Sequence, residues 1–238
     1  MSKKIRIRFS KEGCMKFIGH LEVMHFFQQL IRRSDIPICY SSGMSPHQIM
    51  SFALPLSTGL ESRGEYVDIE TEEDVFIRSK DALKALNSNS VEGIEILSYK
   101  ELPEGCENAM ASVKAADYSI RIREGYEPEA DIVKYFEEMM KKESIIVIKK
   151  TKKSEKETDI RPFIHEHRVR EEGGRPCFEL RLSCGSVDNT KPELVFKALY
   201  SMMGEELNEY ALLIRREEMY TTADNDFVSL DMIGRVTE

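Results

Sequence analysis

The stretch KIRIRF, Lys4–Phe9, decides the fold prediction, because charged and apolar residues alternate along it. A period of two is typical of a β-strand with one buried side and one side facing solvent. The stretch YSIRIR, 118–123, repeats the alternation in the second half of the chain. Each half is therefore expected to open with a strand of the same kind.

The first half predicts a simple order of strands and helices. Apolar residues recur at helical spacing over about 17–33, which predicts an amphipathic helix after the first strand. Alternating residues predict strands within 65–71 and 94–97, with a helix over 74–86 between them. A further strand is expected inside the uncharged segment 36–60, so the order is β-α-β-β-α-β.

The second half predicts the same order with one extra strand. Its two helices are expected at 128–142, which opens with a proline, and at 191–203, which a glycine follows. The strands are expected at 118–123, 144–150, 160–170, 177–183 and 211–216.

This repeated order predicts an α+β fold of tandem ferredoxin-like (βαββαβ) domains with antiparallel sheets. Right-handed crossovers would place both helices of a domain on one sheet face, and the other face must then be solvated or docked to something. The alternative is one continuous α+β domain. The predicted parts are an N-terminal domain at 1–103, a C-terminal domain at 116–222 and a C-terminal tail at 223–238, with the domains joined near 102–115.

The composition is that of an acidic globular protein. The net charge of −8 makes the chain a poor non-specific binder of nucleic acid, except at local basic patches. The N-terminus does not look like a signal peptide, and no apolar run is long enough to span a bilayer. We therefore expect a cytoplasmic protein with no membrane partner.

The five cysteines argue against a bound metal or cluster. No CxxC motif occurs, and six residues separate the closest pair, Cys177 and Cys184. This spacing suits reduced, mostly buried thiols and cannot place three thiolates around an iron–sulfur cluster. We expect no metal and no cofactor in this chain, so any radical chemistry must be done by another polypeptide.

The segment 36–60 carries no Asp, Glu, Lys or Arg, although 32% of the chain is charged. At that frequency, about eight charged residues would be expected. One interpretation is a loop buried against its own domain. The other is the wall of a binding pocket, where Tyr40, Ser41, His47 and Ser51 supply hydrogen bonds without charge.

His20 stands at the predicted start of the first helix, directly after Gly19. The positive end of the helix dipole favours a neutral imidazole there, and the free backbone N–H groups make an anion site. The alternative is a histidine bonded to a nearby carbonyl. If the uncharged loop folds over this helix end, His47 could meet His20, and the pair could act as acid and base on a ribose hydroxyl.

Arginines recur at alternate strand positions. If the apolar residues face the helices, Arg6, Arg8, Arg121 and Arg123 would share exposed sheet faces and contact RNA phosphates. The alternative is an ordinary solvated face with interspersed glutamates.

Several short motifs stand out along the chain. They are FSK (9–11), FIGHLE (17–22), RR (32–33), YSSGMSPH (40–47), SFALPL (51–56) and DIRPFI (159–164). Together they resemble the bacterial radical-SAM-linked protein family. The resemblance covers nearly the whole chain and is most specific in about the first 70 residues. Met44 and Gln48 depart from the usual Phe and Pro of that family.

The resemblance implies a partner protein, because members of that family are encoded beside, or fused to, a radical SAM iron–sulfur protein. Their genes often lie near those for ribonuclease G and ribosomal proteins, which suggests RNA or a ribosomal component as substrate. The residues expected to bind that substrate are His20, Arg32, Tyr40, Ser41, Gly43, His47, Ser51 and Glu65.

The resulting prediction is an accessory substrate-binding module that works with a separate radical SAM enzyme. Two alternatives remain open. One is a metal-independent RNA-processing enzyme that uses His20 and His47, and the other is a purely structural adaptor between proteins.

Overall fold

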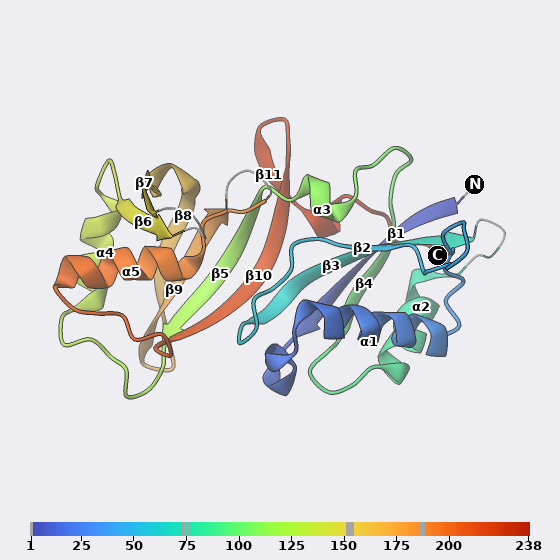
Figure 1. Ribbon diagram of the computed structural model, residues 1–238, viewed down its shortest axis with the longest axis horizontal. Helices are drawn as coiled ribbons and strands as arrows, with labels where there is room; N and C mark the ends of the chain where they lie inside the picture. The colour runs from blue at the N-terminus through green and yellow to red at the C-terminus, as the bar shows by residue number, and fades with distance from the viewer. Residues whose placement is uncertain (1, 73–74, 76, 151–154, 186–188) are drawn as a thin grey trace. The chain divides into compact units, whose positions relative to one another are not determined.

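The protein is α+β, with a large, mostly antiparallel sheet and few helices, as the sequence predicts (Figure 1). Its residues divide into two compact units, of which the first combines Met1–Lys114 with Arg216–Glu238 and the second is Ala115–Arg215. The computed structural model describes residues 2–72, 75, 77–150, 155–185 and 189–238.

The first unit follows the predicted order of elements. β1 pairs antiparallel with both β3 and β4, and β2 pairs antiparallel with β3. β2 lies inside the uncharged segment, as expected, whereas α2 begins later than predicted; residues 73, 74 and 76 lie outside the described part of the chain. The elements are β1 (Ser2–Lys11), α1 (His20–Arg33), β2 (Met50–Phe52), β3 (Glu61–Glu72), α2 (Ser79–Asn89) and β4 (Ile96–Glu101).

The alternation of β1 produces the core of this unit. Ile5, Ile7 and Phe9 are buried on the face that α1 and α2 cover, and one hydrophobic cluster joins them to Phe27 and Leu86. The rings of Phe9 and Phe27 have centroids 4.5 Å apart. Both helices therefore pack on the same face of the sheet, because the apolar side of β1 is the side they bury.

The opposite face of β1 is covered by other parts of the same unit. The Arg6 side chain is only 2% exposed and donates to the carbonyl oxygens of Leu230 at 3.3 Å and Glu107 at 3.4 Å. These acceptors belong to the segments around α3 (Ala109–Ser112) and the 3₁₀ turn Leu230–Met232. Around Arg6, the face that was expected to be solvated or docked to something is therefore covered by these segments of the same chain.

The C-terminal segment forms paired structure where a tail was expected. β10 (Leu212–Ala223) begins among the residues of the second unit and ends in the first, where β11 (Asp226–Ser229) pairs with it. Arg235 and Glu101 exchange two backbone hydrogen bonds of 2.9 Å. The boundary between the units, after residue 215, therefore differs from the predicted domain end at 222, because one strand runs through it.

The second unit has a strand that the sequence did not predict. β9 pairs antiparallel with β5 and β8, while β6 and β7 form a separate hairpin. β7 was not predicted, and residues 161–163 form a 3₁₀ turn at the start of the predicted strand 160–170. The elements are β5 (Ala115–Ile122), α4 (Ile132–Met140), β6 (Ile146–Lys150), β7 (Glu155–Asp159), β8 (Ile164–Glu172), β9 (Arg175–Ser183) and α5 (Pro192–Met203).

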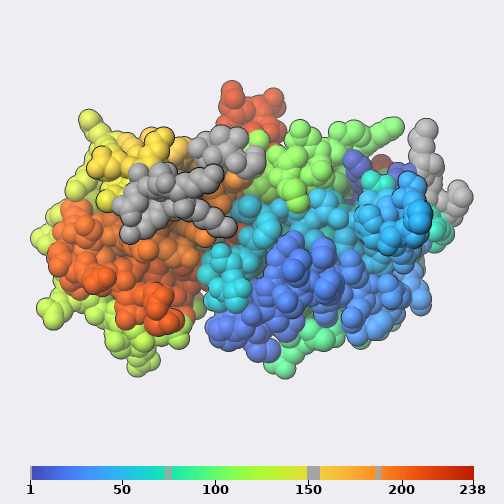
Figure 2. All heavy atoms as spheres, viewed as in Figure 1, coloured from blue at the N-terminus to red at the C-terminus, as the bar shows by residue number. Residues whose placement is uncertain are grey.

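The helices are amphipathic. α1 buries Val23 and Phe27 and exposes Leu21, His25 and Gln29, and its blue atoms lie at the surface of the first unit in the space-filling view (Figure 2). Among the described residues, no helix is both long enough and apolar enough to cross a membrane.

Candidate binding site

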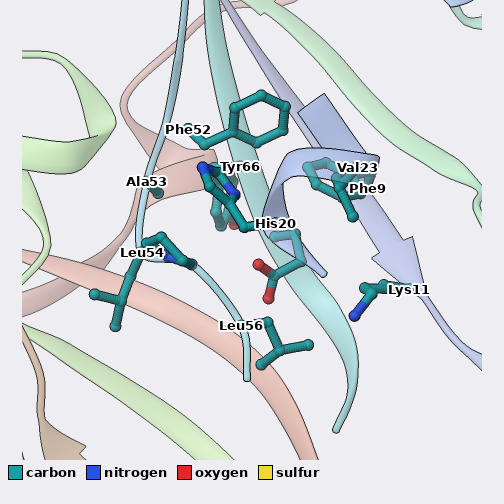
Figure 3. A pocket seen from close by; sticks show the side chains of 11 residues that line it. Phe9, Lys11, His20, Val23, Phe52, Ala53, Leu54, Leu56 and Tyr66 are labelled. Carbon is teal, nitrogen blue, oxygen red and sulfur yellow. The ribbon is translucent and has the colours of Figure 1, made fainter. Parts of the chain in front are cut away.

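The start of α1 lies beside a small recess in the first unit (Figure 3). Part of the uncharged segment, residues 52–56, forms one wall, and residues from β1, β3 and α1 form the others. This half of the segment lines the recess, whereas the residues expected to form a pocket wall, Tyr40, Ser41, His47 and Ser51, are not among its lining residues. The lining residues are Phe9, Lys11, His20, Val23, Phe52, Ala53, Leu54, Pro55, Leu56, Glu65 and Tyr66.

His20 is the first residue of α1 and is half-buried at the recess. Its ring meets Phe52 edge-on, with centroids 5.3 Å apart and planes at 89°. Gly19 caps the helix without a side-chain hydrogen bond, so the first backbone N–H groups have no side-chain cap at that residue. The Glu22 carboxylate lies at the same helix start, because its Oε2 is 2.8 Å from the position that a Cβ on Gly19 would occupy.

Lys11 is the last residue of β1 and its side chain lines the recess although the residue is 2% exposed. Its Nζ donates to the Lys16 carbonyl oxygen at 3.3 Å. Burial lowers the pKa of Lys11; the Glu65 carboxylate acts in the opposite direction, and the Arg216 guanidinium adds to the lowering. The recess therefore contains an ammonium group that is removed from water.

Glu65 and Arg216 form a buried ion pair next to this lysine. Arg216 Nε lies 2.8 Å from one carboxylate oxygen of Glu65, and Nη2 lies 2.6 Å from the other. Nη2 also donates to the Leu54 carbonyl oxygen at 2.7 Å. The ion pair thus holds the wall segment 52–56 against β3.

Tyr66 adds a second polar contact near the recess. Its hydroxyl donates to Glu218, which also forms an ion pair of 3.2 Å with Arg8. Burial, followed by the Glu218 charge, raises the pKa of Tyr66 far above its ordinary value. The phenol therefore stays protonated and acts as a donor to Glu218.

The other half of the uncharged segment lies away from the recess. Cys39 N–H donates to the Glu70 carbonyl, whereas Ala53 N–H donates to the Tyr66 carbonyl. These acceptors are four positions apart in the strand, which corresponds to about 13 Å along β3. Residues 40–47 extend from the end near Glu70, so the structure does not bring His47 to His20.

Residues 41–47 instead form an exposed hairpin with its own hydrogen bonds. Ser41 Oγ lies 2.8 Å from His47 Nδ1 and accepts the His47 backbone N–H at 3.1 Å. Tyr40 is 51% exposed and is bridged to Gln48, and Gly43 has a positive φ of 121° at the turn. These contacts are the local turn chemistry that Ser, Gly and Pro favour.

Of the predicted substrate-binding set, the structure places only His20 and Glu65 at the recess. Arg32 is exposed in the last turn of α1, about 18 Å along the helix from His20. Ser51 is half-buried in β2, opposite Asp68. The remaining four, Tyr40, Ser41, Gly43 and His47, belong to the hairpin and its base.

Arg6 was predicted to contact phosphates and is instead buried in an ion pair. Its Nε and Nη2 bind the two carboxylate oxygens of Asp68 at 2.8 and 2.9 Å, and Asp68 also accepts the Ala109 backbone N–H at 2.7 Å. The alternation correctly separates Arg6 from the apolar face, but the chain covers that second face as well. Arg6 cannot reach RNA in this structure.

The other three predicted phosphate contacts are engaged in ordinary surface interactions. Arg8 donates to two backbone carbonyls besides its ion pair with Glu218. Arg121 lies 3.7 Å from Glu172, and Arg123 donates to a backbone carbonyl at 2.9 Å. Acidic partners therefore neutralise part of this positive charge, as the alternative interpretation of the arginines expected.

Sequence reasoning missed Lys11, Arg216 and Tyr66 at the recess. The sequence contained a signal for two of them. Lys11 lies at an alternate position with Ile7 and Phe9, on the apolar side of its strand, and Arg216 is likewise on the same side as Ile214. A charged residue on the apolar side of a strand predicts a buried charge.

Among the described residues, no group of three or more His, Cys, Asp or Glu side chains lies close enough together to bind a metal ion. The cysteines carry free thiols: Cys177 and Cys184 are buried, Cys39 and Cys106 are half-buried and Cys14 is exposed. Fewer thiols are buried than the sequence suggested.

Comparison with known families identifies the chain. The family model described as "Uncharacterized protein conserved in bacteria (DUF2344)" matches residues 4–192, which is more than half of the chain. The chain belongs to this family. The expected membership in a conserved bacterial family is thus confirmed, whereas the link of DUF2344 to radical SAM proteins stays a prediction. No curated protein matches the chain.

Two solved structures resemble this DUF2344 chain at low identity. One is a chain of "Crystal Structure of a Cbf5-Nop10-Gar1 Complex", with a TM-score of 0.49 and 11% identity over 90% of this chain and 48% of that chain. This chain therefore spans about half the length of that relative. The other is "Crystal Structure of an Unknown Protein from Galdieria sulphuraria", with a TM-score of 0.27, 12% identity and coverage of 97% and 99%.

Proposed function

We propose that this DUF2344 protein is a cytoplasmic accessory subunit that binds RNA, or a ribosomal component containing RNA, for a separate radical SAM enzyme. The observation that carries the proposal is the recess beside His20, where the uncharged wall 52–56 faces the buried Lys11. Such a site favours an anionic group, because its low-dielectric walls strengthen hydrogen bonds to a charge.

An aromatic side chain close to His20 supports RNA as the substrate. Phe17 is 66% exposed, and the Lys16 ammonium lies 5.4 Å from its ring centroid. Exposed aromatic rings beside cations bind unpaired bases by stacking while the cations attract the backbone. Base stacking at Phe17 would add to phosphate binding in the recess.

The proposed role needs a partner for the chemistry. The chain has no CxxC motif, and the structure separates His20 from His47, so the acid–base pair of the enzyme alternative is not assembled. A binding subunit requires neither. The radical SAM partner rests on the family resemblance of motifs such as FIGHLE and SFALPL.

The same proposal treats both units as ferredoxin-like. In the first unit, the element order β1-α1-β2-β3-α2-β4 and the strand order β4-β1-β3, with β2 on β3, support it. In the second unit, the order β5-β9-β8 supports it, with the β6–β7 hairpin as an insertion after α4.

The test is a co-expression and binding experiment. The tagged protein, expressed with the neighbouring radical SAM protein of its own genome, should retain a brown, iron-containing polypeptide through affinity and size-exclusion steps. Fluorescence anisotropy with a single-stranded RNA should show affinity that falls steeply with salt. Absence of both the partner and RNA binding would overturn the proposal, while partner binding without RNA binding would favour the adaptor.

A further inference from the structure

Lys11 has more hydrogen-bond donors than the described protein atoms accept. Its ammonium group has three N–H donors, and the hydrogen bond found for it is the one to the Lys16 carbonyl at 3.3 Å. The residue is 98% buried, since only 2% of its surface is exposed. A buried ammonium group with unfilled donors is unfavourable unless an anion or another acceptor completes its shell.

The carboxylate nearest in the recess does not supply that anion. Both oxygens of Glu65 are bound by Arg216, at 2.8 and 2.6 Å. The recess and its ion pair therefore contain two cations, Lys11 and Arg216, against one carboxylate. The excess positive charge lies at a buried site, where water screens it poorly.

A second polar group faces the same space from another element. Figure 3 shows His20, from the start of α1, and Lys11, from the end of β1, both among the side chains around the recess. Either ring nitrogen of His20 can carry a proton and donate it in a hydrogen bond. The positive end of the α1 dipole adds to the attraction for an anion, while Glu22 in the first turn reduces it.

We propose that the recess binds a phosphate group, with Lys11 as its main cationic contact and His20 as a hydrogen-bond donor. Two unfilled N–H donors of Lys11 and one N–H donor of His20 face the recess, and a phosphate can offer a separate oxygen to each, whereas a carboxylate has only two oxygens. This inference names the group that the recess binds. The further statement that the phosphate belongs to RNA rests on the proposed function.

Binding is tested first with inorganic phosphate on the full chain. Titration calorimetry against potassium phosphate, at constant ionic strength in chloride, should give saturable binding that acetate does not reproduce. Lys11→Met and Lys11→Gln should each weaken binding about tenfold or more, and His20→Gln should weaken it less. Glu22→Gln should tighten it, because a competing negative charge is removed. The matched control is Lys84→Met, at an exposed lysine of α2 that does not line the recess, which should leave the affinity within about twofold.

The source of the phosphate is tested with dinucleotides that carry a 5′-phosphate or a 5′-hydroxyl. Preference for the 5′-phosphate in the wild type, lost in Lys11→Met, would assign the recess to an RNA end. Binding of inorganic phosphate without any RNA binding would support the inference and overturn the proposed function. RNA binding that Lys11→Met and His20→Gln leave unchanged, or an equal loss in Lys84→Met, would overturn the inference and leave the function standing.

Discussion

Arg216 and Glu65 form a two-pronged ion pair inside the first unit, although 151 residues separate them in the sequence. Both residues are buried, and the arginine also binds the Leu54 carbonyl at 2.7 Å. The pair therefore connects β10, β3 and the wall of the recess. The uncharged segment 52–56 is therefore held in place by Arg216, a charged residue that is 162 positions after Leu54 in the sequence.

Removing one partner of this pair should destabilise the protein strongly. Arg216→Met leaves the Glu65 carboxylate buried without its cation, which should lower the free energy of unfolding by about 3–5 kcal/mol. The double variant Arg216→Met with Glu65→Leu should recover much of that loss, because no unpaired charge remains. Urea denaturation followed by circular dichroism measures both. Equal losses in the single and double variants would show that the charge is not the cause.

Gly64 is required by the close approach of two strands within the first unit. A Cβ at this position would lie 2.6 Å from the Glu218 Cα and 2.7 Å from the Glu217 carbonyl oxygen. Gly64→Ala should therefore lower the free energy of unfolding by about 1–3 kcal/mol, since backbone atoms must move. The control is Arg63→Ala at the neighbouring exposed residue, which removes a surface ion pair with Glu12. It should lower the free energy of unfolding by about 1 kcal/mol or less. A harmless Gly64→Ala would contradict this strand contact.

The elements with strong periodicity were predictable from the sequence. The alternation at 4–9 and the helical spacing at 17–33 gave β1 and α1, because each pattern reports a single buried face. β7 was not found, because the segment EKETD, 155–159, is polar throughout and its described pairing is with β6. The return of the C-terminal strand to the first unit could not be found either, since a long-range pairing leaves no local pattern.

The candidate site was predictable only in part. The absence of charge indicated a buried or pocket-lining segment, and residues 52–56 do line a recess beside His20. Composition could not show that 40–47 pairs toward the other end of β3, because both halves of the segment are equally free of charge. Lys11 lies on the same side of the strand as Phe9, which indicated that it could be buried. Alternation alone could not show whether the strand continues to a buried Lys11 or ends before it.

The stability contribution of Lys11 should depend on pH in a definite direction. Burial lowers its pKa from the ordinary 10.5, so the folded state binds fewer protons than the unfolded state between the lowered pKa and 10.5. The wild type should therefore gain stability as the pH rises through that interval. Lys11→Met should be more stable than the wild type at pH 7, and the difference should shrink toward pH 10.

Urea midpoints of the wild type and Lys11→Met at several pH values measure this difference. A Lys11→Met protein that is less stable at every pH would indicate a structural role for the ammonium group. If Lys11 is a functional residue whose burial lowers the stability of the protein, Lys11→Met should increase the stability and lose phosphate binding.

Phe17 should contribute to RNA affinity through stacking. Phe17→Ala should weaken the binding of single-stranded RNA by about 1–3 kcal/mol and leave the binding of inorganic phosphate unchanged. Tyr210→Ala is a suitable comparison, because Tyr210 is an equally exposed aromatic residue of the second unit. Fluorescence anisotropy and calorimetry separate the two ligands. Equal effects of both variants on RNA would mean that stacking does not select Phe17.

The hairpin at 41–47 should prove separable from the recess. His47→Ala removes the ring that contacts Ser41 Oγ at 2.8 Å, and Ser41→Ala removes the other partner of the same bond. Each variant should increase the rate of proteolytic cleavage within 41–47, and the double variant should add little, because the two residues share one interaction. None of the three should change phosphate affinity. The contrary result would be that His47→Ala abolishes phosphate binding, or that His47→Ala and His20→Gln both abolish an RNA cleavage activity. Either result would show that the two histidines act in one site in solution, so the hairpin and the recess would not be separate.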